Sequence, residues 1–112
     1  MITVHRPWGN FQQFTHNEES TVKVITINPE HRLSLQRHSV RDEHWFVLNG
    51  PVEVTLDDSC FTLSKGESLT VYAGQSHRIA NNGPDFARIL EISYGHFDED
   101  DIERIEDEYG RA

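Results

Sequence analysis

Two short segments of the chain carry side chains of the kinds that bind metal ions. The first contains Gln36 and His38, with Glu43 after four further residues, and the second contains His77, with Asn81 four residues later. Two imidazoles, one carboxylate and an amide oxygen can hold one divalent cation and leave coordination positions open. This donor set suits Zn, Fe, Mn, Co or Ni better than Ca or Mg. A single His in a strand is more often a hydrogen-bonded structural residue, so the prediction depends on both segments reaching one cavity.

The length and composition are typical of one small globular domain. The chain has 112 residues, of which 36% are hydrophobic and 26% charged, and no apolar run approaches the ~18 residues of a membrane span. The single Cys60 excludes an internal disulfide, and the first nine residues have no apolar signal-peptide core. We therefore expect a cytoplasmic location and no membrane partner.

The charge is concentrated near the C-terminus. The net charge is −9, and residues 98–108 contain eight acids and one arginine. Nothing resembles the basic patch that nucleic-acid phosphates require, so we expect no nucleic-acid partner. Within the acidic tail, residues 98–112, the spacing of Ile102, Ile105 and Tyr109 predicts a short helix over 100–109, with acids at its N-terminal end. A solvated acidic tail is the alternative.

The rest of the chain has the pattern of an all-β protein. Apolar residues alternate with a period of two, and turn signals recur every 8–12 residues, which predicts a sandwich or barrel. The expected strands are residues 22–28, 32–38, 43–48, 52–56, 61–63, 68–72, 75–80 and 86–94. Residues 8–14 are expected to add an edge strand within an N-terminal arm, residues 1–14.

Strand parity places the metal-binding side chains on one face. Side chains two positions apart point the same way, so Gln36 and His38 share a face with Ser34. On the next strand, Trp45 is in phase with Glu43. A small barrel would bring these two strands and the one beginning near residue 75 around one cavity.

The spacing also resembles a known family. The pattern Q-x-H-x4-E-x6-G, followed by G-x7-G-x2-H-x3-N, resembles the two cupin motifs, with Gln36 in place of the usual first His and Tyr72 in place of a Pro. Several further motifs look narrower: Arg6-Pro7-Trp8-Gly9, Leu33-Ser34-Leu35-Gln36, Glu43-His44-Trp45, Gly74-Gln75-Ser76-His77-Arg78 and the tail from Asp100 to Arg111. Together they resemble the cupin domain of the type II mannose-6-phosphate isomerase family, which usually forms the C-terminal domain of a mannose-1-phosphate guanylyltransferase.

The resemblance implies a fold and an activity. The fold is a small cupin, a jelly-roll-like β-barrel, here spanning residues 1–112 as one domain. The activity is the metal-dependent interconversion of mannose 6-phosphate and fructose 6-phosphate through an enediol. The implied metal ligands are Gln36, His38, Glu43 and His77, with Zn as the expected cation. The implied substrate-binding residues are Ser34, Arg41, Arg104 and Arg111; local ion pairs are the alternative for Arg41 and Arg104.

The catalytic base is less well defined by the sequence. Glu91 lies in a strongly apolar strand, where a carboxylate is either inward and functional or paired with an arginine. Lys23 and Arg41 are further catalytic candidates. His44 alternates with Glu43 and should point away from it, into a structural or interfacial position.

Two departures from the family leave other functions open. Ser39 and Val40 stand where the family usually has histidines, and 112 residues leave no room for a nucleotidyltransferase domain. A non-catalytic sugar- or nucleotide-sugar-binding cupin, acting as an accessory subunit to a separate guanylyltransferase chain, is therefore the main alternative. A different metal cupin, such as an oxygenase, is a third possibility. Family analogy also predicts a homodimer that uses the N-terminal arm.

Overall fold

A computed structural model describes residues 2–98 and 100–109, which form twelve strands and no helix. Arg111, one of the expected phosphate ligands, lies outside the described residues. No helix in the described ranges is long and apolar enough to cross a membrane. The expected all-β fold is confirmed.

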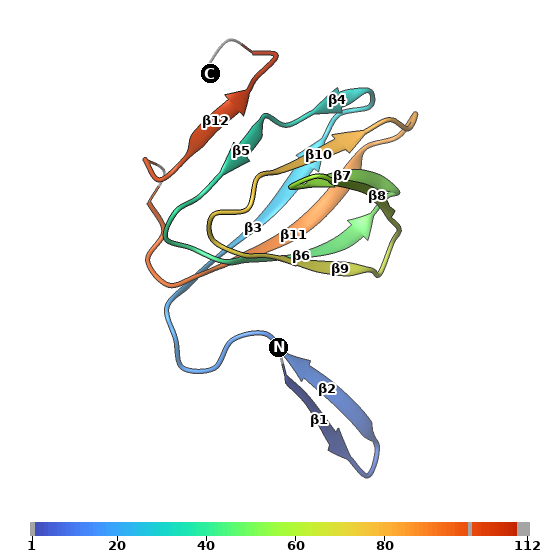
Figure 1. The fold of residues 1–112 in the computed structure, drawn as a ribbon. Helices are drawn as coiled ribbons and strands as arrows, with labels where there is room; N and C mark the ends of the chain where they lie inside the picture. The colour runs from blue at the N-terminus through green and yellow to red at the C-terminus, as the bar shows by residue number, and fades with distance from the viewer. Residues whose placement is uncertain (1, 99, 110–112) are drawn as a thin grey trace.

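Two antiparallel sheets face each other and enclose the core (Figure 1). The first sheet has the order β3 (Ser20–Ile27), β11 (Ala87–Tyr94), β6 (Glu43–Asn49) and β9 (Ser68–Val71). The second has the order β12 (Glu103–Glu106), β5 (Leu35–Arg37), β10 (His77–Asn81), β7 (Val52–Leu56) and β8 (Ser59–Leu63), with β4 (His31–Arg32) also pairing with β10. The buried apolar core between them comprises Ile27, Trp45, Val47, Val52, Val54, Leu63, Val71, Ile79, Ala87 and Ile89.

Alternation along the central strands divides the interior into an apolar part and a polar part. In β6, Val47 is fully buried in the apolar core, while Glu43, four residues earlier on the same face, is 1% exposed. In β11, Ile89 is paired with Val47, and Glu91 follows on the same inward face. The barrel therefore has two carboxyl groups buried at one end of its interior. Packing alone would favour apolar residues there, so these groups indicate a functional site.

The strand expected over residues 32–38 is interrupted. β4 ends at Arg32 and β5 begins at Leu35, although Leu33 still donates its backbone N–H to the Ile79 carbonyl at 3.0 Å. β5 ends at Arg37, so His38 lies in the loop just beyond the strand. Gln36 is therefore held by strand pairing, whereas His38 depends on contacts outside the ladder, among them the hydrogen bond from Gly74 N–H to its backbone oxygen at 2.6 Å.

The expected C-terminal helix is wrong, because part of the segment forms β12. This strand pairs with β5, placing Glu103 opposite Arg37 and Arg104 opposite Gln36. The Arg37 Nε donates to Glu103 Oε2 at 2.7 Å. An isolated helix of ten residues is marginal in water, whereas the free edge of β5 offers unpaired backbone groups. Tertiary pairing therefore outweighs the local 3.6-residue pattern.

The N-terminal arm forms a separate hairpin instead of the expected edge strand. β1 (Ile2–Arg6) pairs only with β2 (Gly9–Gln13), and the hairpin extends away from the two sheets (Figure 1). Trp8 in its turn is 73% exposed. Just after the hairpin, the Phe14 ring lies 5.2 Å from the ring of His44 on β6, so the arm is anchored at its base.

Candidate metal centre

Three buried side chains meet at the polar end of the barrel. His38 follows β5, Glu43 begins β6 and His77 begins β10, and none is more than 3% exposed. One ligand atom from each lies within 4.8 Å of the others. The Nε2 atom of His38 is 3.1 Å from the Nε2 of His77 and 3.2 Å from Oε2 of Glu43, while His77 Nε2 is 4.0 Å from Oε1 of Glu43. Sequence segments far apart in the chain thus converge as expected.

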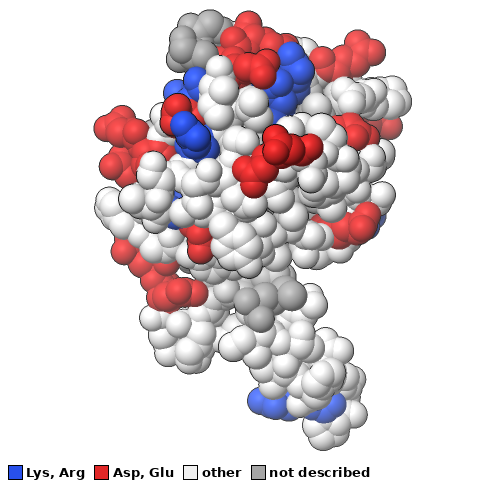
Figure 2. Space-filling view, in the orientation of Figure 1, with Lys and Arg blue, Asp and Glu red and all other residues white. Residues whose placement is uncertain are grey.

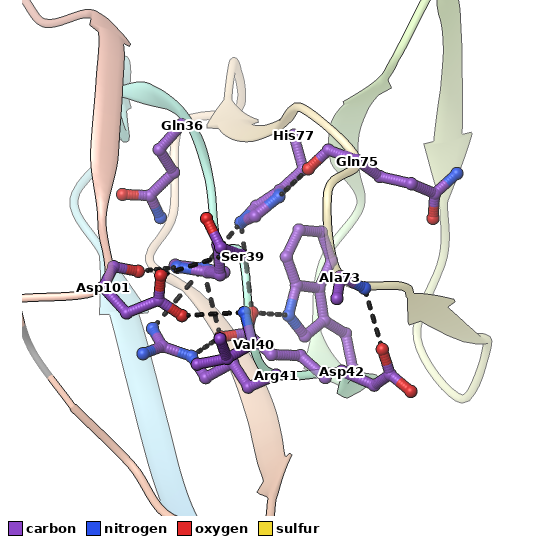
Figure 3. A network of polar contacts seen from close by, with 12 residues as sticks. Gln36, Ser39, Val40, Arg41, Asp42, Ala73, Gln75, His77 and Asp101 are labelled. Atoms are coloured by element: carbon purple, nitrogen blue, oxygen red, sulfur yellow. Dashed lines mark hydrogen bonds and ion pairs between the residues drawn. The ribbon is translucent and has the colours of Figure 1, made fainter.

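The outer nitrogens of both imidazoles fix their tautomers. His38 Nδ1 lies 3.1 Å from the backbone oxygen of Asp101, and His77 Nδ1 lies 3.0 Å from that of Gln75 (Figure 3). A carbonyl oxygen can only accept, so each Nδ1 carries the hydrogen and each Nε2 faces inward. Where neither Nε2 carries a proton, two lone pairs at 3.1 Å repel each other unless a cation lies between them. This is the arrangement found around metal-bound histidines, whose other nitrogen is held by a carbonyl or carboxylate.

The spacing also fits a common ion. Ligand atoms bound to one cation at about 2.1 Å lie roughly 3 to 3.5 Å apart. Two of the three separations fall in that range, and a small rotation of the Glu43 carboxylate would shorten the third. The residues present therefore fit a divalent metal, and imidazole with carboxylate is compatible with Zn and with several redox metals.

Glu43 is held ionised by its neighbours. Burial raises the pKa of this carboxyl group, but a hydrogen bond from Glu91 and the interactions with His38 and Arg41 outweigh burial, so the pKa of Glu43 lies below its usual value. Arg41 donates Nε–H to Oε2 at 3.0 Å, and Trp45 donates Nε1–H to Oε1 at 3.3 Å. The carboxylate is thus charged and oriented for coordination.

Glu91 lies inward beside Glu43, where the sequence left two alternatives open. Burial, followed by the charge of Glu43 and the hydrogen bond to it, raises the pKa of Glu91 to about 8; Lys23 and Arg41 act in the opposite direction. Lys23 is directly opposite Glu91 in the pairing of β3 with β11. A buried carboxyl group that keeps its proton at neutral pH is a common feature of functional sites.

Arg41 is drawn into the site rather than paired at the surface. It is 5% exposed, and besides Glu43 it donates from Nη1 to the backbone oxygen of Asp98 at 3.0 Å. Its guanidinium lies 4.2 Å from the centre of the Phe97 ring, and Lys23 Nζ lies 3.9 Å from the same ring. Arg41 therefore orients Glu43, and its donors are largely committed to protein groups.

Two further candidates, Gln36 and Arg104, lie in line with His77 across the second sheet. His77 pairs with Gln36, and Gln36 pairs with Arg104, so the three side chains share a face. Ser34 is 3% exposed and donates to Gln36 Oε1 at 3.1 Å. The Nε of Arg104 is buried and has no hydrogen-bond partner among the described residues. This nitrogen is thus a buried donor without an acceptor on the strand next to Gln36, within the described part of the chain.

The two residues that depart from the family pattern lie outside the ligand set. Ser39 and Val40 are exposed, and their described contacts with the site are backbone N–H groups that donate to the Asp101 carboxylate, each at 3.0 Å. His44 lies on the outer face of β6, as parity predicts, with its Nδ1 3.0 Å from Thr70 Oγ1. Sequence reasoning missed Asp101 and Gln75, because a backbone carbonyl that orients a ligand has no side-chain signature.

Two packed antiparallel sheets with a buried His, Glu and His centre define a cupin. Solved structures agree on the fold: the capsular polysaccharide assembling protein CapF from Staphylococcus aureus matches with a TM-score of 0.71 and 21% identity over 94% of this chain and 34% of that chain. The cupin domain of Schizosaccharomyces pombe Cnp3 matches with a TM-score of 0.66 and 18% identity over 75% of this chain and 61% of that one.

Sequence comparison identifies the family within this class. Residues 1–107 match the family described as mannose-6-phosphate isomerase C-terminal, and the chain belongs to it. The alginate biosynthesis protein AlgA of Pseudomonas aeruginosa is 44% identical over 110 residues, which cover 97% of this chain and 23% of that protein. The mannose-1-phosphate guanylyltransferase ManC of Salmonella typhimurium is 38% identical, again over 97% of this chain and 23% of its own length. The chain thus spans about a quarter of these relatives.

Proposed function

We propose that this protein is a metal-dependent isomerase that interconverts mannose 6-phosphate and fructose 6-phosphate. The observation that carries the proposal is the buried cluster of His38, Glu43 and His77, with Glu91 beside it, in a chain of this family. Gln36 is proposed as a fourth ligand through its amide oxygen, because it is paired with His77. Zn is the expected cation, and Mn, Fe, Co or Ni would suit the same donors.

The reaction moves a proton from C2 to C1 of the sugar, while the carbonyl shifts the opposite way, from C1 to C2; the reverse reaction exchanges the two carbons. A cation held by the three buried ligands would supply Lewis-acid stabilisation of the oxygens at these two carbons. Glu91 is the proposed acid–base group: with a pKa of about 8, the minor ionised fraction near neutral pH accepts the proton, and the protonated form returns it. Lys23, opposite Glu91, is the second candidate. Arg41 would keep Glu43 charged and correctly oriented.

The phosphate of the substrate needs a cationic partner. Arg104 is the proposed partner, because its Nε is buried without a hydrogen-bond partner in the described part of the chain and it shares a face with Gln36. Ser34, whose hydroxyl is hydrogen-bonded to Gln36, would help to position that face. Arg111 stays a prediction from the sequence.

A coupled isomerase assay on the wild type and on His77→Ala, with metal content measured on both, tests the proposal. The wild type should contain about one metal per chain and turn over mannose 6-phosphate, and the variant should lose both properties. Metal-loaded wild type without turnover would contradict the isomerase and favour a sugar- or nucleotide-sugar-binding accessory subunit. The exposed positions of Ser39 and Val40, beside the ligand His38, motivate that second candidate.

Two partners are also proposed. Because relatives such as ManC are named as guanylyltransferases, a separate guanylyltransferase chain is one candidate. A calorimetric titration against such an enzyme tests it, and no heat of binding would argue against the association. The cytoplasmic location stays a prediction.

A second copy of this chain is the other candidate partner. On the outer face of β3, Val22 and Val24 are 58% and 57% exposed, and the hairpin turn exposes Trp8. Residues 1–17 contain Arg6 and no acid, whereas the body carries many acidic side chains on the face seen in Figure 2. Exchange of the two arms between copies would cover apolar surface on both. Light scattering should give twice the chain mass, with a shift toward monomer in Trp8→Ala; a monomeric wild type would refute the dimer.

A further inference from the structure

The C-terminal segment makes the contacts that hold the first ligand segment in place. His38 lies beyond the end of β5, outside the strand pairing that fixes Glu43 and His77, although its backbone oxygen accepts a hydrogen bond from Gly74 N–H at 2.6 Å. Residues about sixty positions later in the chain supply further contacts, to the His38 ring and to the residues that follow it. Figure 3 shows Asp101 directly beside Ser39 and Val40, within the network that surrounds the histidines.

Asp101 makes three contacts with consecutive residues of this loop. Its backbone oxygen lies 3.1 Å from Nδ1 of His38 and accepts the hydrogen that this nitrogen carries. Its carboxylate accepts from the backbone N–H groups of Ser39, through Oδ1, and of Val40, through Oδ2, each at 3.0 Å. One residue thus holds both the ring of the ligand and the chain that follows it.

Hydrogen bonds before and after Asp101 also connect the C-terminal segment to the loop that contains His38. Before it, the backbone oxygen of Asp98 accepts both Arg41 Nη1–H and the N–H of Asp101 itself, at 3.0 and 3.1 Å. After it, Glu103 on β12 accepts two hydrogen bonds from Arg37, at 2.7 and 3.0 Å. The residues that flank His38 on both sides, Arg37 and Arg41, are therefore bound to the same C-terminal segment.

We propose that Asp101 is a positioning residue for the metal ligand His38: its carboxylate fixes the loop so that its carbonyl can orient the imidazole. The inference rests on the metal site of the proposed function. Within residues 2–98 and 100–109, the hydrogen bonds to this carboxylate come from backbone N–H groups, so the side-chain departures from the family at Ser39 and Val40 leave the arrangement intact. Partners that orient a ligating His commonly change metal affinity 10- to 100-fold when they are removed.

The test uses cobalt as a spectroscopic substitute for the native cation. Asp101→Ala removes both carboxylate hydrogen bonds, and Asp101→Asn keeps the size and one acceptor oxygen. Asp100→Ala is the matched control, because Asp100 is the neighbouring acid and its side chain is exposed. The full chain is titrated with Co²⁺ against a competing chelator, and the visible d–d spectrum and the melting temperature of the metal-free protein are recorded.

We expect Asp101→Ala to bind Co²⁺ about tenfold more weakly and with an altered d–d spectrum. Asp101→Asn should lie between it and the wild type, and Asp100→Ala should equal the wild type. Wild-type affinity and spectrum in Asp101→Ala would overturn the inference. So would a lower melting temperature with an unchanged spectrum and affinity, because that result assigns Asp101 a purely structural role.

The outcome is separable from that of the proposed function, since no sugar is present in the titration. Weaker cobalt binding in the variant, together with a wild type that turns over no sugar phosphate, would contradict the isomerase and support the role of Asp101. If Asp101→Ala does not fold, the comparison of Asp101→Asn with Asp100→Ala decides the question on the same two readouts.

Discussion

Glu43 and Glu91 occupy neighbouring inward positions on β6 and β11, and their pKa values are displaced in opposite directions. The pKa of Glu43 lies below its usual value, whereas burial and the adjacent Glu43 charge raise the pKa of Glu91 to about 8. Two carboxylates this close cannot both be ionised without cost, so Glu91 keeps its proton and donates a hydrogen bond to the ionised Glu43. Pairs of this kind distinguish a ligand from an acid–base group.

Replacement of Glu91 by Gln should separate these two roles. The amide keeps the shape and can still donate a hydrogen bond to Glu43, but it cannot accept the substrate proton. We expect the isomerase rate to fall by at least about 100-fold, because a positioned acid–base group contributes roughly 10²- to 10⁴-fold. Metal content should stay near that of the wild type, as measured by elemental analysis alongside the coupled assay.

Glu53→Gln is the control for this variant. Glu53 is exposed on β7, and its carboxylate accepts a hydrogen bond from Thr62 on the neighbouring strand. The control variant should retain full activity. Wild-type turnover in Glu91→Gln would transfer the proton-carrying role to Lys23, which lies opposite it.

Metal binding should stabilise the folded chain through His77. The site is assembled from three separate strands or loops, so the unfolded chain does not present it, and a cation at 100 times its dissociation constant adds about 2.7 kcal/mol to the free energy of unfolding. Chelation of the wild type should lower its melting temperature. In His77→Ala, the melting temperature should not respond to added Zn²⁺; a full response there would place the bound ion elsewhere.

The inward positions of two candidate ligands, Glu43 and His77, were predictable from the sequence, because they depend on local strand parity. Alternation along β6 places Glu43 and Trp45 on the inward face and His44 outside, as the structure shows. Parity also brought His77 to the same interior. Each of these predictions required only the residues within one strand and the assumption of a closed barrel.

The contacts that hold the ligands were not predictable in the same way. The segment that forms β12 was expected to be helical. It is a strand because it pairs with the free edge of β5, 66 residues earlier, through contacts such as that of Arg37 with Glu103, and local spacing does not encode such a pairing. The backbone oxygen of Asp101 accepts a hydrogen bond from the His38 ring. Every residue type has such an oxygen, so the sequence does not indicate this contact. The projecting hairpin was likewise expected as an edge strand, because its turn and alternation do not specify which strand it pairs with.

Removal of the Arg104 side chain should weaken substrate binding more than turnover. Its Nε is buried and unpartnered in the described ranges, and a hydrogen bond to a charged group contributes about 1.5 to 3 kcal/mol. We expect the KM for mannose 6-phosphate to rise roughly 10- to 100-fold in Arg104→Ala, with a smaller change in kcat. Steady-state kinetics on this variant and on Arg88→Ala, whose side chain is exposed on β11, provide the comparison. Equal KM values in the two variants would remove Arg104 from the phosphate site.

The acid sensitivity of the metal-free protein should depend on His44. Burial lowers the pKa of this imidazole in the folded protein, and its Nε2 has no hydrogen-bond partner among the residues described. Below about pH 6.5 the unfolded chain therefore binds a proton at this position that the folded protein does not. The sign follows directly: the free energy of unfolding of the wild type should fall, relative to that of His44→Gln, as the pH decreases below about 6.5, and the two should run parallel above pH 7.5. Urea denaturation of both chelated proteins at pH 5.5, 6.5 and 7.5 measures the difference. A gap between the two that is the same at all three pH values would mean that His44 titrates alike in the folded and unfolded states.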